Sequence, residues 1–194
     1  MSIPADDPLL QAALSGAPAI RYTGPAFRMM PGGDVVRNLT FEHLWAGSGP
    51  GRCNPAGIGR LHLSAEKKTA QAEFRYYAAK GGFDPDLAES YEFAADVKLA
   101  RVLNLTDGAT RRLVGITRAQ ILADWEGDPL LPPPLPTRLQ TIGCWISQGH
   151  GNFSAILYPA RRRSTGSNLV IFKGRLGSGD SINPLSKHPT KSWP

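Results

Sequence analysis

The stretch GRCNPAGIGRLHLSAEKKTAQAEF, residues 51–74, decides the fold, because it runs from a glycine-rich loop through a strand into a helix. Five glycines and two prolines fall within residues 47–59, a density that predicts a loop. Residues 60–63 predict a short strand that leaves this loop. The loop matches neither the P-loop nor the dinucleotide-binding fingerprint, since no Gly-Lys-Ser/Thr follows it and no strand, GxGxxG and helix unit is formed. Such loops are where ligand-binding groups collect.

A helix is predicted to follow this strand. The Ser64 hydroxyl can cap its first turn, and Glu66 in that turn suits the helix dipole. The helix is expected to run to about Lys80, where two glycines end it. Its apolar residues recur at helical spacing and are expected to face the core. They are Ala70, Phe74, Tyr77 and Ala78.

The rest of the chain alternates between strand and helix signals. Extended segments are predicted at residues 24–33, 91–99, 102–105, 155–158 and 169–172, the last two closing around a basic turn. Two helices of about ten residues are expected to begin at capping boxes, in which a threonine and a glutamine satisfy each other's backbone donors. The pairs are Thr117 with Gln120 and Thr137 with Gln140. We therefore expect an α+β fold, a single compact domain with a small mixed, mainly antiparallel sheet and flanking helices.

Length and composition favour one domain with short extensions. The 194 residues, 41% of them apolar, can build one sizeable core. Residues 1–20 predict an N-terminal arm or short helix, and residues 21–175 the domain itself. Residues 176–194 have little apolar content and predict a loosely ordered C-terminal tail. Five prolines within residues 129–136 predict a rigid connector.

The chain carries 22 Lys and Arg against 16 Asp and Glu, a formal charge of +6, which suits nucleic acid, a membrane surface or a phosphate-bearing substrate. The basic residues form scattered clusters, the densest being residues 161–163. Neither the aromatic and basic strands of an RNA reader nor a basic recognition helix is present, so we do not expect direct nucleic-acid binding.

Other classes are also disfavoured. The longest apolar runs fall far short of the ~18 residues that a membrane helix needs, and the N-terminus lacks the pattern of a secretory signal. We therefore expect a cytoplasmic protein without membrane contact. Cys53 and Cys144 are too few for a disulfide framework or a zinc site and predict reduced, buried thiols. The four histidines show no metal-ligand spacing, and no serine, histidine and acid set can be argued.

Glu73 is the most unusual charged residue, because no cation stands three or four residues away on its helix. An exposed glutamate is one interpretation. The other is a carboxylate that faces a cleft and a cation from another segment, for which Arg28 is the natural candidate. Arg52, in the glycine-rich loop, could bind a phosphate through its guanidinium fork, although a plain surface turn explains the loop equally well.

Taken together, several segments resemble the RES domain family in the family's own order. The loop at residues 51–57, the strand at 60–64 and the helix at 69–73 resemble its signature of an Arg-Trp-Asn loop, a strand and a helix with an essential glutamate. Further similarities cover an opening arginine strand, a mid-chain strand, a helix start and a closing hairpin. They lie at residues 26–28, 102–106, 139–143, 156–161 and 168–172.

The resemblance assigns roles to individual residues. Arg28 and Glu73 occupy the arginine and glutamate of the family name and are expected to be catalytic. The serine of that name falls on Ala160, so either the enzyme is weakened, the chain is an inactive variant, or Ser154 or Ser164 takes the role. Cys53 stands where the loop usually has tryptophan. The residues expected to bind substrate are Arg52, Asn54, His62, Ala160 and Asn168.

The resemblance also implies a function. RES proteins are bacterial toxins that consume NAD by hydrolysis, phosphorolysis or ADP-ribosyl transfer, on a fold similar to that of ADP-ribosyltransferases. NAD would be the substrate, and no metal is implied. The implied partner is an Xre-type helix-turn-helix antitoxin that covers the cleft and assembles with the toxin into an oligomer. Two alternatives stay open: an ADP-ribosyltransferase that modifies a specific cellular protein, and a catalytically weakened NAD-binding interaction protein.

Overall fold

A computed structural model describes residues 7–32, 36, 38–45, 49–84, 86, 89–125 and 136–192. Its helices are α1 (Pro8–Gly16), α3 (Lys67–Lys80), α4 (Gly108–Leu113), α5 (Arg118–Leu122) and α6 (Arg138–Ser147). Short 3-10 turns are η1 (Phe41–Trp45), η2 (His150–Asn152) and η3 (Lys173–Arg175). The strands are β1 (Ala19–Pro31), β2 (Arg60–Ser64), β3 (Ser90–Asn104), β4 (Ala155–Pro159), β5 (Ser167–Phe172), β6 (Ser181–Pro184) and β7 (Thr190–Ser192).

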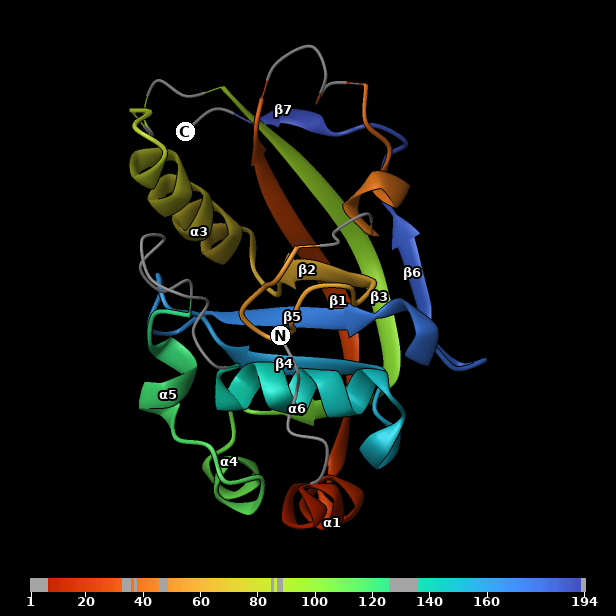
Figure 1. The fold of residues 1–194 in the computed structure, drawn as a ribbon. Helices are drawn as coiled ribbons and strands as arrows, with labels where there is room; N and C mark the ends of the chain where they lie inside the picture. Colours follow the sequence, from red (N-terminus) through yellow and green to blue (C-terminus); the bar gives the residue numbers. More distant parts are fainter. Residues whose placement is uncertain are drawn as a thin grey trace.

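The strands form one seven-stranded sheet that closes on itself. The order is β1-β2-β5-β4-β3-β6, and β1 also pairs along almost its whole length with β3, which completes a ring of five strands. The β3 and β4 pairing is parallel, and the other pairings are antiparallel. In Figure 1, α6 lies along β4, and α3 lies beside the upper part of β1 and β3. The expected mixed, mainly antiparallel α+β domain is confirmed.

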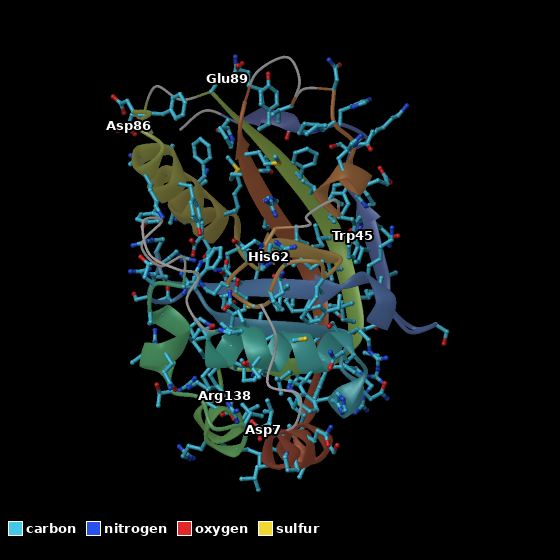
Figure 2. The ribbon with its side chains drawn as sticks, in the orientation of Figure 1. Asp7, Trp45, His62, Asp86, Glu89 and Arg138 are labelled. Carbon is cyan, nitrogen blue, oxygen red and sulfur yellow. The ribbon has the colours of Figure 1, made fainter. Side chains whose placement is uncertain are left out.

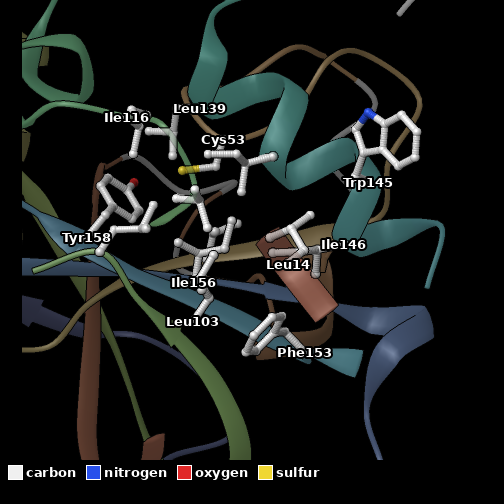
Figure 3. Packing of buried hydrophobic residues seen from close by; sticks show 14 of the residues in the cluster. Leu14, Cys53, Leu103, Ile116, Leu139, Trp145, Ile146, Phe153, Ile156 and Tyr158 are labelled. Atoms are coloured by element: carbon white, nitrogen blue, oxygen red, sulfur yellow. The ribbon is translucent and has the colours of Figure 1, made fainter. Parts of the chain in front are cut away.

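Apolar side chains pack on both sides of the short strands. Inside the ring, alternate residues of β2 and β5, such as Leu61 and Ile171, meet residues of β1 and β3. On the outer face, Val170 and Tyr158 pack with α6, α1 and Cys53 (Figure 3). The strands are therefore buried on two faces, as their short apolar runs suggest.

The two chain extensions are integrated into the fold. The segment expected to form a loosely ordered tail contributes β6 and β7, both of which pair with β3. Backbone pairing with a long strand supplies the order that the apolar content could not predict. At the other end, α1 buries Leu10 and Leu14, and Asp7 accepts a hydrogen bond from the Leu10 amide and forms an ion pair with Arg138 at 2.6 Å (Figure 2).

Helices α3, α5 and α6 match their predicted positions with two differences, whereas no helix is predicted where α4 lies. The capping boxes at Thr117 and Thr137 are both formed, but α5 spans only 5 residues where about ten were expected, whereas α6 spans 10. Helix α3 ends at Lys80 as predicted, yet it begins after Glu66, and the Ser64 hydroxyl does not cap it. Ser64 is the last residue of β2, and its hydroxyl donates to Asn168 instead. The expected proline connector, apart from Pro136, lies outside the described residues.

Helix α6 fixes the glycine-rich loop at Gly143. A Cβ atom on Gly143 would overlap the carbonyl of Cys53, and Gln140 also donates to the Gly51 carbonyl at 2.9 Å. We expect Gly143→Ala to lower the free energy of unfolding by about 1–3 kcal/mol, because backbone must move to admit the methyl group. Urea denaturation measures the loss. Gly59→Ala is the matched control, because nothing lies within 4 Å of the added Cβ. Equal stability of the two variants would contradict the close contact between Gly143 and the Cys53 carbonyl.

Candidate active site

One cavity, of about 640 Å³, gathers most of the residues that the sequence singled out. It lies between α3, the strands β1 and β2, and the glycine-rich loop. Its polar lining comprises Arg28, His43, Arg52, Arg60, His62, Ser64, Glu73, Tyr77, Tyr158 and Asn168. Site roles are predicted from the sequence for Arg28, Arg52, His62, Glu73 and Asn168. Ser64, Arg60 and the two tyrosines have no predicted place in the site.

Alternation along β2 explains two of the missed residues. Arg60, His62 and Ser64 line the cavity, while Leu61 packs inside the ring. Leu63 packs inside the ring too and also borders the cavity. Successive side chains of a strand point to opposite faces, so one functional residue implies that its neighbours two positions away share its face. That period is readable from RLHLS once His62 is taken as a site residue.

The floor of the cavity is cationic. The Arg28 guanidinium donates to the His62 carbonyl at 3.3 Å, and Nε of Arg60 donates to Nε2 of His62 at 3.1 Å. Burial, with a further contribution from Arg60, lowers the pKa of Arg28. Burial followed by the charges of Arg28 and Arg60 lowers the pKa of His62 to about 3. His62 is therefore neutral, and because Arg60 can only donate, the ring proton sits on Nδ1.

Arg52 is anchored by the C-terminal end of α5. Its Nη1 donates to the carbonyls of Ile121 at 2.8 Å and Ala123 at 2.7 Å, and the side chain still lines the cavity. Asn54 closes the turn through backbone hydrogen bonds with Gly51 in both directions. These contacts hold the guanidinium in place at the cavity wall.

Two predicted substrate-binding residues do not reach the cavity. Asn54 is completely buried, and its amide donates to the Pro55 carbonyl at 2.6 Å. Ala160 is also buried, and its backbone amide donates to Gly166. Neither residue is part of the cavity lining, although Oδ1 of Asn54 lies 3.4 Å from Nε2 of the lining residue His62. Ser154 donates to the Arg101 carbonyl, and Ser154 and Ser164 lie outside the lining as well.

Glu73 is held by an amide. Nδ2 of Asn168 donates to Oε1 of Glu73 at 3.1 Å. The expected ion pair with Arg28 is not formed within the part of the chain that the structure describes, although Arg28 and Glu73 line the same cavity. Glu73 thus faces a cleft, which is one of the two interpretations of the sequence. Its partner is the neutral amide of Asn168 and not a cation.

Two tyrosines complete the wall near Glu73. Burial first, and then the charge of Glu73, raises the pKa of Tyr77. Burial raises the pKa of Tyr158 well above its ordinary value, and Cys53 beneath it and Glu73 add to the rise. Both phenols therefore stay protonated at neutral pH and can donate hydrogen bonds.

The arginine run joins neighbouring elements beside the cavity. The Arg162 guanidinium lies 3.1 Å from the centre of the Tyr76 ring on α3. Arg161 forms an ion pair with Asp124 at 3.6 Å, and Arg163 one with Glu66 at 3.8 Å. Each of these arginines has a partner within the chain, which accounts for part of the positive charge.

The arrangement suits one kind of ligand. Three arginines and a neutral histidine favour an anionic group such as a phosphate, and a single carboxylate can stabilise a positive charge that develops nearby. These side chains can therefore orient a ligand and stabilise charge on it. Among the residues that the structure describes, no group of histidine, cysteine, aspartate or glutamate side chains could hold a metal ion.

The buried neutral histidine makes stability depend on pH. The pKa of His62 is about 3 in the folded chain and near 6.5 when unfolded, so the unfolded state binds more protons between these values and stability falls as pH drops from 6.5. We expect a contribution of up to about 1.4 kcal/mol per pH unit. Urea denaturation of the wild type and of His62→Gln at pH 4.5 to 7.5 tests this contribution. The difference between their free energies of unfolding should be constant above pH 7 and change below pH 6.5. Parallel curves would contradict it.

Comparison with known proteins identifies the family to which this chain belongs. The model of the RES domain family matches residues 25–192, nearly the whole chain. The chain therefore belongs to the RES domain family, as its segments suggested. A chain in the crystal structure of the M. tuberculosis MbcT-MbcA toxin-antitoxin complex has the same fold, with a TM-score of 0.67 at 18% identity over 96% of this chain and 93% of that one.

No curated protein matches this sequence. In the ranges that the structure describes, no helix has both the length and the apolar character needed to span a membrane.

Proposed function

We propose that this protein is a bacterial toxin that consumes NAD by cleaving the bond between nicotinamide and ribose. Membership of the RES domain family supports the proposal, and so does the fold shared with a chain of a toxin-antitoxin complex. The single observation that carries it is the placement of Glu73, held by Asn168, in one cavity with Arg28, Arg52 and Arg60.

These residues match the demands of the reaction. Nicotinamide leaves as a neutral molecule from a pyridinium, so the leaving group needs little acid catalysis, and the barrier lies in forming an oxocarbenium-like ribose cation. Glu73 would hydrogen-bond a ribose hydroxyl and stabilise the developing charge, as carboxylates do at the anomeric centre of sugars. The electron pair of the broken bond stays on the nicotinamide nitrogen.

The arginines would bind the other part of the substrate. Arg28 and Arg52 would hold the pyrophosphate through charge-assisted hydrogen bonds and orient the ribose against Glu73. His62 would present its Nδ1 hydrogen or its ring face to the nicotinamide mononucleotide half. The cavity volume, about 640 Å³, is in the range of cofactor-sized sites.

The proposal includes a partner. A helix-turn-helix antitoxin of the Xre type would cover the cleft and form an oligomer with this chain in the cytoplasm. Co-expression should then relieve growth arrest that the chain causes alone, and arrest that persists with the cognate antitoxin would count against the pairing.

The fate of ADP-ribose defines the reaction class. Purified protein is incubated with labelled NAD in buffer, with phosphate, and with cell lysate. Free ADP-ribose indicates hydrolysis, its phosphate ester indicates phosphorolysis, and a discrete labelled protein band indicates an ADP-ribosyltransferase with a specific acceptor. Repeating the assay with Ala160→Ser shows whether the missing hydroxyl weakens the enzyme. Binding of NAD with no nicotinamide release under any condition would overturn the catalytic proposal and support a binding protein.

A further inference from the structure

We propose that Ser64 is a positioning residue for the reaction: its hydroxyl fixes the amide of Asn168, and that amide fixes Glu73. The inference rests on the proposed function, because it assigns Glu73 to catalysis. It adds a residue for which the sequence predicts only a helix cap. Ser64 lines the cavity, whereas Ser154 and Ser164 do not.

Strand pairing brings the three groups together. Ser64 on β2 stands directly opposite Asn168 on β5, and Asn168 stands opposite Tyr158 on β4. Directly opposed residues place their side chains on the same face of a sheet. The Ser64 hydroxyl lies 2.8 Å from Oδ1 of Asn168, and Nδ2 of Asn168 lies 3.1 Å from Oε1 of Glu73. A continuous hydrogen-bonded chain therefore runs from β2 through β5 to α3.

The donors and acceptors allow one orientation. An ionised carboxylate only accepts, so the NH2 group of Asn168 must face Glu73 and its carbonyl must face Ser64. The carbonyl needs a donor, because Asn168 is 8% exposed and Ser64 5% exposed. The Ser64 hydroxyl is that donor. Without it, the buried carbonyl of Asn168 has no donor, and the hold of the amide on Glu73 weakens.

The first test separates positioning from folding. Ser64→Ala should lower kcat for nicotinamide release roughly tenfold, the size of effect expected when a group that orients a catalytic residue is lost. KM should stay within about twofold, because the phosphate-binding arginines are untouched. Ser64→Thr keeps the hydroxyl on a strand and should restore most of the rate. Ser147→Ala, which removes a half-buried hydroxyl that donates to the Cys144 carbonyl outside the cavity lining, should behave as the wild type.

The second test does not depend on the stability of Ser64→Ala. Asn168→Asp places a second carboxylate against Glu73, and two carboxylates so close cannot both stay ionised. The acid limb of the pH profile of kcat should move to higher pH. Tyr77 and Tyr158 also interact with Glu73, but their raised pKa values keep both phenols neutral across this range. An unshifted profile would contradict the contact between Asn168 and Glu73.

The outcomes separate the two proposals. A wild type that releases no nicotinamide overturns the proposed function and the role of Ser64 with it. An active wild type with a fully active, folded Ser64→Ala overturns the role of Ser64 alone. If Ser64→Ala does not fold, a slow Ser64→Thr together with an unshifted Asn168→Asp profile overturns that role as well.

Discussion

Glu73→Gln should reduce the rate of nicotinamide release by about 10²–10³-fold, the usual cost of removing one group that stabilises charge in a transition state. Glutamine has the size and shape of glutamate, and its amide oxygen can still accept from Asn168. What disappears is the negative charge that would stabilise the ribose cation. Steady-state release of nicotinamide from NAD measures the effect, and kcat should carry it.

Two measurements make the Glu73 result specific. NAD binding to Glu73→Gln, followed by calorimetry, should survive, since the arginines bind the phosphates. Glu42→Gln removes the same charge from an exposed residue outside the cavity lining and should be as active as the wild type. Normal turnover by Glu73→Gln would contradict the catalytic role of Glu73.

Arg28→Ala should lower kcat/KM roughly 100-fold, mainly through KM. The guanidinium lines the cavity and would form charge-assisted hydrogen bonds with a pyrophosphate, each worth about 1.5–3 kcal/mol. Arg28→Lys keeps the charge but not the planar fork, so only part of the loss should be recovered. The measurement is the dependence of nicotinamide release on NAD concentration.

The matched control for Arg28 lies on the same strand. Arg21 is exposed on β1 and outside the cavity lining, so Arg21→Ala should leave KM unchanged. An unchanged KM for Arg28→Ala would contradict a role in phosphate binding. Arg28 also donates to the His62 carbonyl, so its removal could unfold the chain. Circular dichroism distinguishes such unfolding from a loss of phosphate binding.

Local signals predict the elements near the site well. The capping boxes at Thr117 and Thr137 work through contacts within three residues, and such contacts are readable from sequence alone. The alternation from residue 91 to 99 predicts the central strand β3, because a half-buried strand needs that period. Glu73 stands out in the sequence for its lack of a cation on the same helix, and it does line the cavity.

The parts that sequence reasoning missed depend on long-range contacts. Glu73 is held by Asn168, 95 residues away, and no local pattern marks that pair. Ser64 has the local pattern of a helix cap, and only the pairing of β2 with β5 turns its hydroxyl to Asn168. Asn54 is expected to bind substrate from the resemblance to the family's loop, and in the structure its side chain donates to the Pro55 carbonyl while its backbone bonds to Gly51.

Strands β6 and β7 could not be predicted from the sequence because they too depend on long-range contacts. Their segment has few apolar residues, so hydrophobic patterning could not detect it, and its order comes from backbone hydrogen bonds to β3. Whether such a segment forms a strand depends more on the neighbouring strand with which it pairs than on its own composition.

A proton NMR time course of NAD mixed with a catalytic amount of the purified wild-type chain follows cleavage of the nicotinamide bond directly. We expect the nicotinamide resonances of NAD to decay and one free nicotinamide to appear for each NAD consumed, whereas Glu73→Gln in a parallel tube should show almost no change. NAD that remains intact over hours with the folded wild type would contradict it.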